Sequence, residues 1–340
     1  MDSNSLLLFF NQKQPRRIRV IENILTGRKT VSTLFWGMRY GILDQLGMFK
    51  SLDLNEDHDS LKQLLGLNLL KPTFKNQYLL TQTGLLEQNK IRANYYAPKS
   101  LNANFQYNVK RFRARFLLIV QIISEFSFHN VKYYPLQIDF KDAMMVKRWF
   151  HTYKHHQLIP KIKHLIESLL NQLPTQVAWQ MASTFVGHDE AGQTYLQQSL
   201  ALKKSVFEIK MMNFDLFCAM IHLIIKDNDP MMMGILNGLK RNLASDSAIK
   251  TFQLSEQESL DMVEKKRHIK MSTVQEHILE VAICTPKHKF PFHHFLNHQM
   301  MNRLASTYSG AIDDWDYRSL NGHSIDFFYF RLYQIFRSKL

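Results

Sequence analysis

Residues 245–282 read SDSAIKTFQLSEQESLDMVEKKRHIKMSTVQEHILEVA, and this stretch decides the fold expected for the C-terminal part of the chain. Two of its serines, Ser255 and Ser272, are each followed three residues later by Glu or Gln, which is the spacing of a helix-capping box. The pattern predicts helices over 255–267 and 272–282, with the polar run from Lys265 to Lys270 forming the turn between them.

Apolar residues recur at helical spacing in both predicted helices. In the second helix the buried positions are expected at Val274, Ile278 and Ala282, and the open face at Thr273, Glu276, His277 and Glu280. Two capped helices joined by a short polar turn are typical of a helix-turn-helix, whose second helix can enter a major groove. Any two short helices of a bundle give the same pattern, however. Residues 245–282 also hold five basic and seven acidic residues, a poor balance for binding phosphates.

The charge of the chain is concentrated in its first half. The 340 residues include 43 Lys and Arg against 29 Asp and Glu, a net charge of +14. Residues 1–170 hold 25 basic and 12 acidic residues, whereas residues 171–340 hold 18 and 17. Such an excess attracts polyanions, nucleic acid and anionic membrane alike, without reading a sequence.

The 90–116 segment, KIRANYYAPKSLNANFQYNVKRFRARF, combines seven basic residues with six aromatic ones and contains no acid. Single-stranded nucleic acid is bound by such combinations, because cations follow the phosphates while rings stack on the bases. The candidate nucleic-acid-binding residues here are Lys110, Arg111, Arg113 and Arg115. Phe112 and Phe116 are also spaced as core residues, so a solvated face with ion pairs, or a protein interface, are the alternatives.

Composition favours an all-α fold. Hydrophobic residues make up 45% of the chain, and only 12 Gly and 9 Pro are available for the turns that β-rich folds need. We expect a multi-helical N-terminal region over 1–229 and a C-terminal helix-turn-helix domain over 245–340. Gly27 is expected to end one helix and Thr30 to cap the next. Residues 73–81 are expected to form a short strand or an extended segment, and the helix over 192–226 to break near Asn213.

The motifs of several enzyme classes are missing. The segment TGRKT, residues 26–30, would need a glycine at 22 and a lysine at 28 to form a phosphate-binding loop, but the chain has Glu22 and Arg28. The motifs G-x-S-x-G, H-E-x-x-H and C-x-x-C do not occur. We therefore predict a non-enzymatic protein with no catalytic residue, cofactor or small-molecule substrate. The histidines 288, 293, 294 and 298, with Cys284, are interpreted as a surface cluster rather than a zinc site, because no carboxylate completes the set.

The location follows from the apolar segments. No uncharged apolar stretch reaches 18 residues and the N-terminus lacks the basic start of a secretory signal, so no membrane partner and a cytoplasmic location are expected. Two cysteines, Cys218 and Cys284, rule out a disulfide framework.

Both ends of the chain resemble the YpbB family of Firmicutes, helix-turn-helix proteins often encoded beside a RecQ-type DNA helicase. Residues 18–49, IRVIENILTGRKTVSTLFWGMRYGILDQLGMF, are similar to the start of that family. The C-terminal matches to the family's helix-turn-helix domain, which is also appended to many RecQ-type helicases, are Arg267, Ser272, Thr273, Val274, His277, Ile278, Glu280, Phe328, Phe330, Arg331 and Leu332. The linker over 284–298 departs from the family, being basic and rich in histidine.

The resemblance implies a DNA-binding accessory protein of a RecQ-type helicase, acting in DNA repair or recombination. In this interpretation the partners are DNA and the helicase. The C-terminal residues expected to contact DNA are Lys265, Lys266, Arg267, Lys270, Thr273, Gln275 and His277. The alternative is a protein-interaction adaptor, in which the helix-turn-helix docks a protein and never touches DNA.

Overall fold

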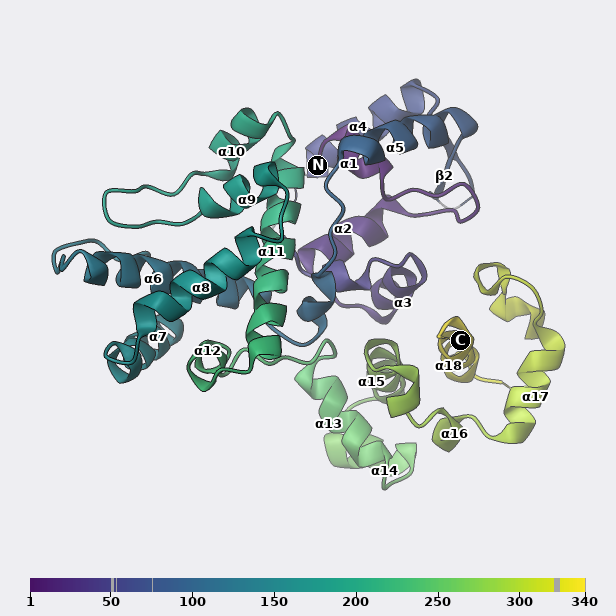
Figure 1. Ribbon diagram of the computed structural model, residues 1–340. Helices are drawn as coiled ribbons and strands as arrows, with labels where there is room; N and C mark the ends of the chain where they lie inside the picture. Colours follow the sequence, from purple (N-terminus) through teal and green to yellow (C-terminus); the bar gives the residue numbers. More distant parts are fainter. Residues whose placement is uncertain (50–51, 53, 75, 321–324, 340) are drawn as a thin grey trace. The chain divides into compact units, whose positions relative to one another are not determined.

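The chain is all-α, as predicted. The computed structural model describes residues 1–49, 52, 54–74, 76–320 and 325–339, shown in Figure 1. Within this part 64% of the residues are helical and 3% lie in strands. No helix of the described residues combines the length and the apolar character that crossing a membrane requires.

The chain forms two compact units that do not follow the order of the sequence. Unit 1 comprises Met1–Pro15 and Met48–Arg241, and unit 2 comprises Arg16–Gly47 and Asn242–Leu340. The passage from unit 1 to unit 2 after Arg241 falls inside the boundary region expected from the sequence. The assignment of residues 16–47 to an N-terminal region was wrong, because their helices pack against the C-terminal helices instead.

Unit 1 is a bundle of helices with one small hairpin. Its elements are α1 (Ser3–Leu7), α4 (Leu54–Gly66), β1 (Leu70–Pro72), β2 (Tyr78–Leu80), α5 (Gln82–Asn94), α6 (Val109–Ser127), α7 (Phe140–Tyr153), α8 (Leu158–Leu170), α9 (Thr175–Ala182), α10 (Tyr195–Leu202), α11 (Val206–Asp227) and α12 (Pro230–Ile235). Strands β1 and β2 pair antiparallel, with Leu70 opposite Leu80. The strand or extended segment expected over residues 73–81 therefore contains β2 near its end.

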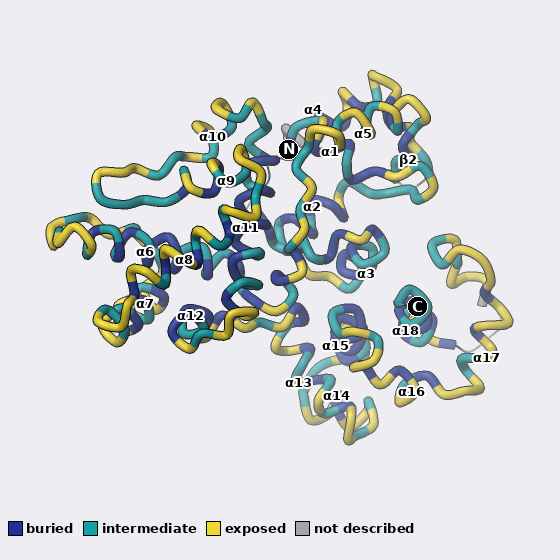
Figure 2. Tube along the Cα trace, in the orientation of Figure 1, coloured by how far each residue is buried: buried dark blue, intermediate teal, exposed yellow. Residues whose placement is uncertain are grey.

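Helix α11 forms the centre of unit 1 and is buried along most of its length (Figure 2). Phe217 of α11 lies 6.2 Å from Phe112 and 6.3 Å from Phe116 of α6, measured between ring centroids. The break expected near Asn213 is absent, because the Asn213 amide is buried and hydrogen-bonded to other elements. The interruption lies earlier, at Lys203, whose φ of 55° ends α10.

Unit 2 surrounds α15 with other helices. Its elements are α2 (Ile18–Thr26), α3 (Val31–Arg39), α13 (Asp246–Ser255), α14 (Leu260–Arg267), α15 (Met271–Cys284), α16 (Phe292–Phe295), α17 (His298–Thr307) and α18 (Phe327–Ser338). Gly27 ends α2 with φ 88°, and the Thr30 hydroxyl accepts from the Thr33 amide at the start of α3, as predicted. Helix α15 packs against α13, α14, α18 and α3.

Candidate nucleic-acid interface

Helices α14 and α15 have the connectivity of a helix-turn-helix. The turn between them is only His268–Lys270. His268 adopts the left-handed conformation, with φ 51°, and its amide bonds to the last carbonyls of α14. Helix α13 packs on both α14 and α15. Two helices joined by a tight turn and backed by a third are the arrangement that DNA-binding helix-turn-helix domains use.

Neither predicted capping box forms. Ser255 is the last residue of α13, which begins earlier because the Ser245 hydroxyl caps it. Helix α14 is capped by Ser259 instead. Ser272 is exposed at the second position of α15, whose first amide, on Met271, donates to a carboxylate oxygen of Glu264 at 2.7 Å. A side chain of the preceding helix thus satisfies the α15 N-terminus.

The buried face of α15 agrees with the prediction. Val274, Ile278 and Ala282 are fully buried. Near the start of the helix Thr273 and Gln275 are partly exposed, and Glu276 is exposed. These positions in the first turns are where a recognition helix reaches base edges.

Two residues expected on the open face of α15 are engaged inside unit 2. The Nδ1 atom of His277 lies 2.8 Å from the Thr251 hydroxyl, and burial lowers the pKa of His277. The Glu280 carboxylate accepts from the amide of Ser245 at 2.6 Å and also from its hydroxyl. His277 is therefore removed from the candidate DNA contacts, and both side chains tie α15 to α13.

The predicted cations of the turn are only partly available. Lys266 pairs with Glu258, and the Arg267 guanidinium donates to the Ser247 hydroxyl at 3.0 Å. Lys265 and Lys270 are exposed, and neither forms an ion pair within the described residues. These two lysines flank the start of α15 and are the cations best able to contact phosphates there.

Arg111 and Arg115 of the 90–116 segment share one buried carboxylate. Arg111 donates to Asp142 through Nε at 2.8 Å and Nη2 at 2.7 Å. Arg115, whose side chain is 3% exposed, donates to the same carboxylate at 2.7 Å and to two backbone carbonyls. Burial alone would raise the pKa of Asp142, but the hydrogen bonds from Arg111 and Arg115 hold that pKa below its ordinary value. Phosphate contact by Arg115 is therefore excluded, and the guanidinium of Arg111 is already paired with Asp142 inside unit 1.

The aromatic residues of this segment do not form a stacking surface. Phe112 and Phe116 are fully buried. The Tyr96 hydroxyl donates to Asp215 at 2.7 Å, and the Tyr95 hydroxyl lies 2.8 Å from that of Ser5. The alternative interpretation from the sequence, in which Phe112 and Phe116 are core residues, is therefore confirmed.

Lys110 and Arg113, by contrast, border a hollow of about 400 Å³ on unit 1. Arg113 donates through Nε to the Asn213 side-chain oxygen at 2.7 Å. The other side chains around the hollow come from α10 and α11 and from the residues just after Gly47. Of the four predicted cations in the 90–116 segment, these two are the ones that the structure brings together at an accessible site.

Sequence reasoning missed the exposed basic surface of unit 1, which lies on α7 and the connection before it. Tyr134 is 96% exposed and Phe140 is 76% exposed. Lys147 and Arg148 are exposed on α7, about two turns beyond Phe140. A signal was available, because residues 143–166 contain five basic residues and no acid.

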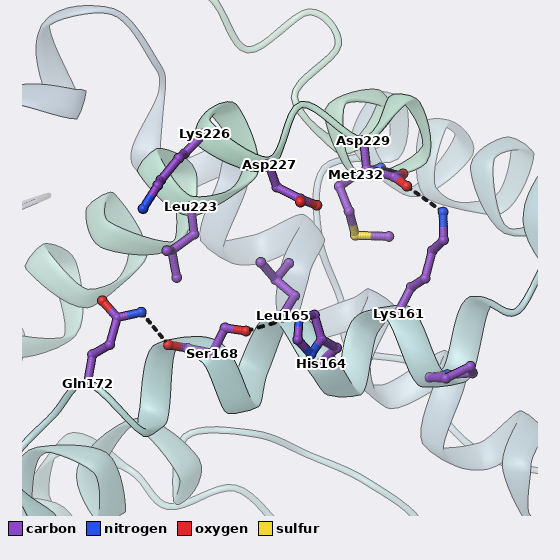
Figure 3. A pocket seen from close by; sticks show the side chains of 11 residues that line it. Lys161, His164, Leu165, Ser168, Gln172, Leu223, Lys226, Asp227, Asp229 and Met232 are labelled. Carbon is purple, nitrogen blue, oxygen red and sulfur yellow. Dashed lines mark hydrogen bonds and ion pairs between the residues drawn. The ribbon is translucent and has the colours of Figure 1, made fainter.

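A second hollow, of about 640 Å³, lies between α8, α11 and α12 (Figure 3). Lys161 pairs with Asp229 at one end of it. On α8, the Ser168 hydroxyl lies 3.4 Å from Nε2 of His164, one turn away. A serine nucleophile needs a histidine oriented by a third group, and no described carboxylate is hydrogen-bonded to His164. The geometry therefore gives a polar surface hollow and not a catalytic triad.

The histidine cluster of the 284–298 linker does not assemble a metal site in the described part of the chain, where no group of three His, Cys, Asp or Glu side chains converges. His294 instead lies with Nε2 2.8 Å from the carbonyl oxygen of Ser255. The rings of His293 and His298 stack with centroids 5.8 Å apart.

Residues 16–47 and 242–340 meet inside unit 2. The guanidinium of Arg331, on α18, stacks on the Phe35 ring of α3 at 4.0 Å. Arg39 of α3 pairs with Asp313 at 2.6 Å, and the Lys29 ammonium donates to the carbonyl of Leu243 at 2.6 Å. Residues far apart in the sequence therefore build one folded body.

Comparison with known proteins adds no relative. No protein-family model matches the chain, and neither the curated proteins nor the solved structures that were searched contain a match.

Proposed function

We propose that the protein is a non-enzymatic DNA-binding accessory protein that works with a RecQ-type helicase in DNA repair or recombination. One observation carries the proposal. Residues 18–47, nearly the whole of the first family-like segment, lie in the same unit as the C-terminal segment, and the contacts of Arg331 and Arg39 join the two. The middle of the chain forms most of the other unit, together with Met1–Pro15. The resemblance thus coincides with a structural boundary.

In this proposal α15 enters the major groove with its first turns. Thr273 is the side chain there best placed to reach base edges, since His277 is held by α13. Gln275 can do so by giving up the hydrogen bond that its amide donates to Asp326 at 3.3 Å. Lys265 and Lys270 contact the flanking phosphates, which fix the register of the helix on the duplex.

A protein-interaction adaptor is the second candidate, and one observation favours it. The Glu264 carboxylate occupies the N-terminus of α15, where a phosphate would otherwise bind the free amides. Glu276 adds an exposed negative charge one turn further on. Both features suit a basic protein partner better than DNA.

The deciding experiment is a titration of the full chain with duplex DNA at several salt concentrations. The variant Lys265→Gln/Lys270→Gln should flatten the plot of log K against log salt by up to about 2 units, since each phosphate contact contributes about 0.9. The control Lys62→Gln/Lys90→Gln removes the same charge from surface lysines of unit 1 that pair with acids. Equal slopes in the parent and the Lys265→Gln/Lys270→Gln variant, or no duplex binding at low salt, would contradict the DNA-binding proposal. The protein-interaction adaptor would then be the remaining candidate.

A further inference from the structure

Arg113 differs from its neighbours because no carboxylate among the described residues balances its charge. Arg111 and Arg115 share Asp142, whereas the hydrogen bond of Arg113 goes to the neutral amide of Asn213. Its guanidinium lies 5.4 Å from the ring centroid of Tyr195 and 5.7 Å from that of Phe217. Among the described residues no acidic side chain pairs with Arg113.

The group that holds Arg113 is itself fixed. Asn213 is 1% exposed, its amide nitrogen donates to the Thr184 hydroxyl at 3.2 Å, and its oxygen also accepts from the Tyr195 hydroxyl at 3.2 Å. The guanidinium is therefore oriented in advance through Nε. Beyond that bond the guanidinium lies beside the Tyr195 side chain, and no acidic side chain in the described part of unit 1 pairs with it.

The hollow beside Arg113, here called the Arg113 pocket, gathers further positive charge. Of its described lining residues three are basic and none is acidic. Lys210 of α11 is half-buried and forms no ion pair with any described residue. Apolar and aromatic side chains make up most of the remaining wall: Met48, Phe49, Val109, Ala114, Tyr195 and Phe214.

We infer that the Arg113 pocket binds a nucleotide unit, with its phosphate on Arg113 and Lys210 and its base against the aromatic wall. Half-buried cations that lack a counter-charge are costly, and an anion between them removes that cost. A guanidinium can donate to phosphate oxygens, and the partly exposed Tyr195 ring, with the edges of the buried Phe49 and Phe214 rings, can contact a base. The volume of about 400 Å³ suits a ligand of this size.

This inference goes beyond the proposed function, because it concerns unit 1 and does not require the helix-turn-helix to bind DNA. A nucleotide unit can come from a free mononucleotide or from the phosphorylated end of a single strand. The two sources share one chemistry, and different probes separate them.

The test uses the full chain and calorimetric titration with adenosine monophosphate, adenosine, inorganic phosphate and a 5′-phosphorylated oligothymidylate. We expect the monophosphate or the phosphorylated strand to bind, and adenosine to bind much more weakly. Lys210→Gln should weaken binding about tenfold or more, since it removes a charged partner of the phosphate. Lys203→Gln, an exposed site with the same loss of charge, should bind as the parent does.

A second variant separates binding from folding. Arg113→Lys keeps the charge but loses the planar fork, so it should weaken the binding of the phosphate probes while unit 1 melts near the parent temperature. Binding by Lys210→Gln and Arg113→Lys at parental strength would overturn the inference, as would a parent that binds none of the phosphate probes. Phosphate binding as tightly as the monophosphate would refute the base contact. The Lys265→Gln/Lys270→Gln variant should bind the nucleotide as the parent does. A failure of the helix-turn-helix proposal can therefore be distinguished from a failure of the Arg113 pocket.

Discussion

Replacing Asp142 by Asn tests whether the arginines of the 90–116 segment are internal partners or contacts for nucleic acid. The Asp142 side chain is 2% exposed and receives hydrogen bonds from Arg111 and Arg115. In the variant Arg115 stays buried and loses the only carboxylate with which it pairs in the described chain. Breaking a buried ion pair from one side costs about 3–5 kcal/mol.

The expected loss is large enough to measure by thermal unfolding. For a unit of about 200 residues each kcal/mol moves the melting temperature by roughly 2–4 °C, so the transition of unit 1 should fall by roughly 6–20 °C. The hydrogen bonds from the two arginines outweigh burial and keep the pKa of Asp142 low in the folded state, so the Asp142 contribution is lost only as the pH falls through that lowered pKa. The difference between parent and variant should therefore stay constant from about pH 5 to 8.

Asp139→Asn is the matched control. Asp139 caps α7 only three residues away, is exposed, and would lose the same charge while Asn still accepts the capping hydrogen bonds. Its melting temperature should stay close to that of the parent. If Asp142→Asn were as stable as the parent and bound DNA with a steeper salt dependence, Arg111 and Arg115 would be free cations and the reasoning from their burial would be wrong.

The other predictions concern both units. Ser259→Ala should cost about 0.5–2 kcal/mol through the lost cap of α14, measured by denaturation of the full chain. Phe35→Ala should speed amide exchange in α15 and α18, far away in the sequence, because the fully buried ring belongs to unit 2; unchanged exchange would contradict that assignment. Burial lowers the pKa of His277, so the unfolded chain binds more protons and unit 2 should melt earlier as the pH falls below about 6.5, less so in His277→Gln. Lys147→Gln/Arg148→Gln should flatten the salt dependence of DNA binding by up to about 2 units if the α7 surface contacts phosphates, and a fluorescence titration would detect this.

Local patterns predicted the end of α2, the cap of α3 and the buried face of α15, because the causes of these features are local. The φ of Gly27 and the hydroxyl of Thr30 act within a few residues, and the spacing of Val274 and Ile278 reflects one helical face. The all-α class follows from such signals together with the scarcity of Gly and Pro.

Contacts between elements decided what the sequence could not. Ser272 lost its capping role because Glu264 of the preceding helix reaches the α15 N-terminus first. Asp142 lies on another helix, and nothing in the sequence spacing shows that its carboxylate meets Arg111 and Arg115. Asn213, which usually weakens a helix, is kept in α11 by buried hydrogen bonds.

Unit 2 is built from two separate segments of the chain, so its two parts are synthesised at different times. Helices α2 and α3 are the first parts of unit 2 to leave the ribosome, but the helices that cover the Phe35 face follow only after the whole of Met48–Arg241. Unit 1 can complete most of its packing during this interval, since nearly all of it is continuous. The face of α3 that packs on α15 therefore stays uncovered while Met48–Arg241 is being synthesised, although α2 already contacts another part of α3. A nascent chain stopped before α15 would keep that face exposed to water.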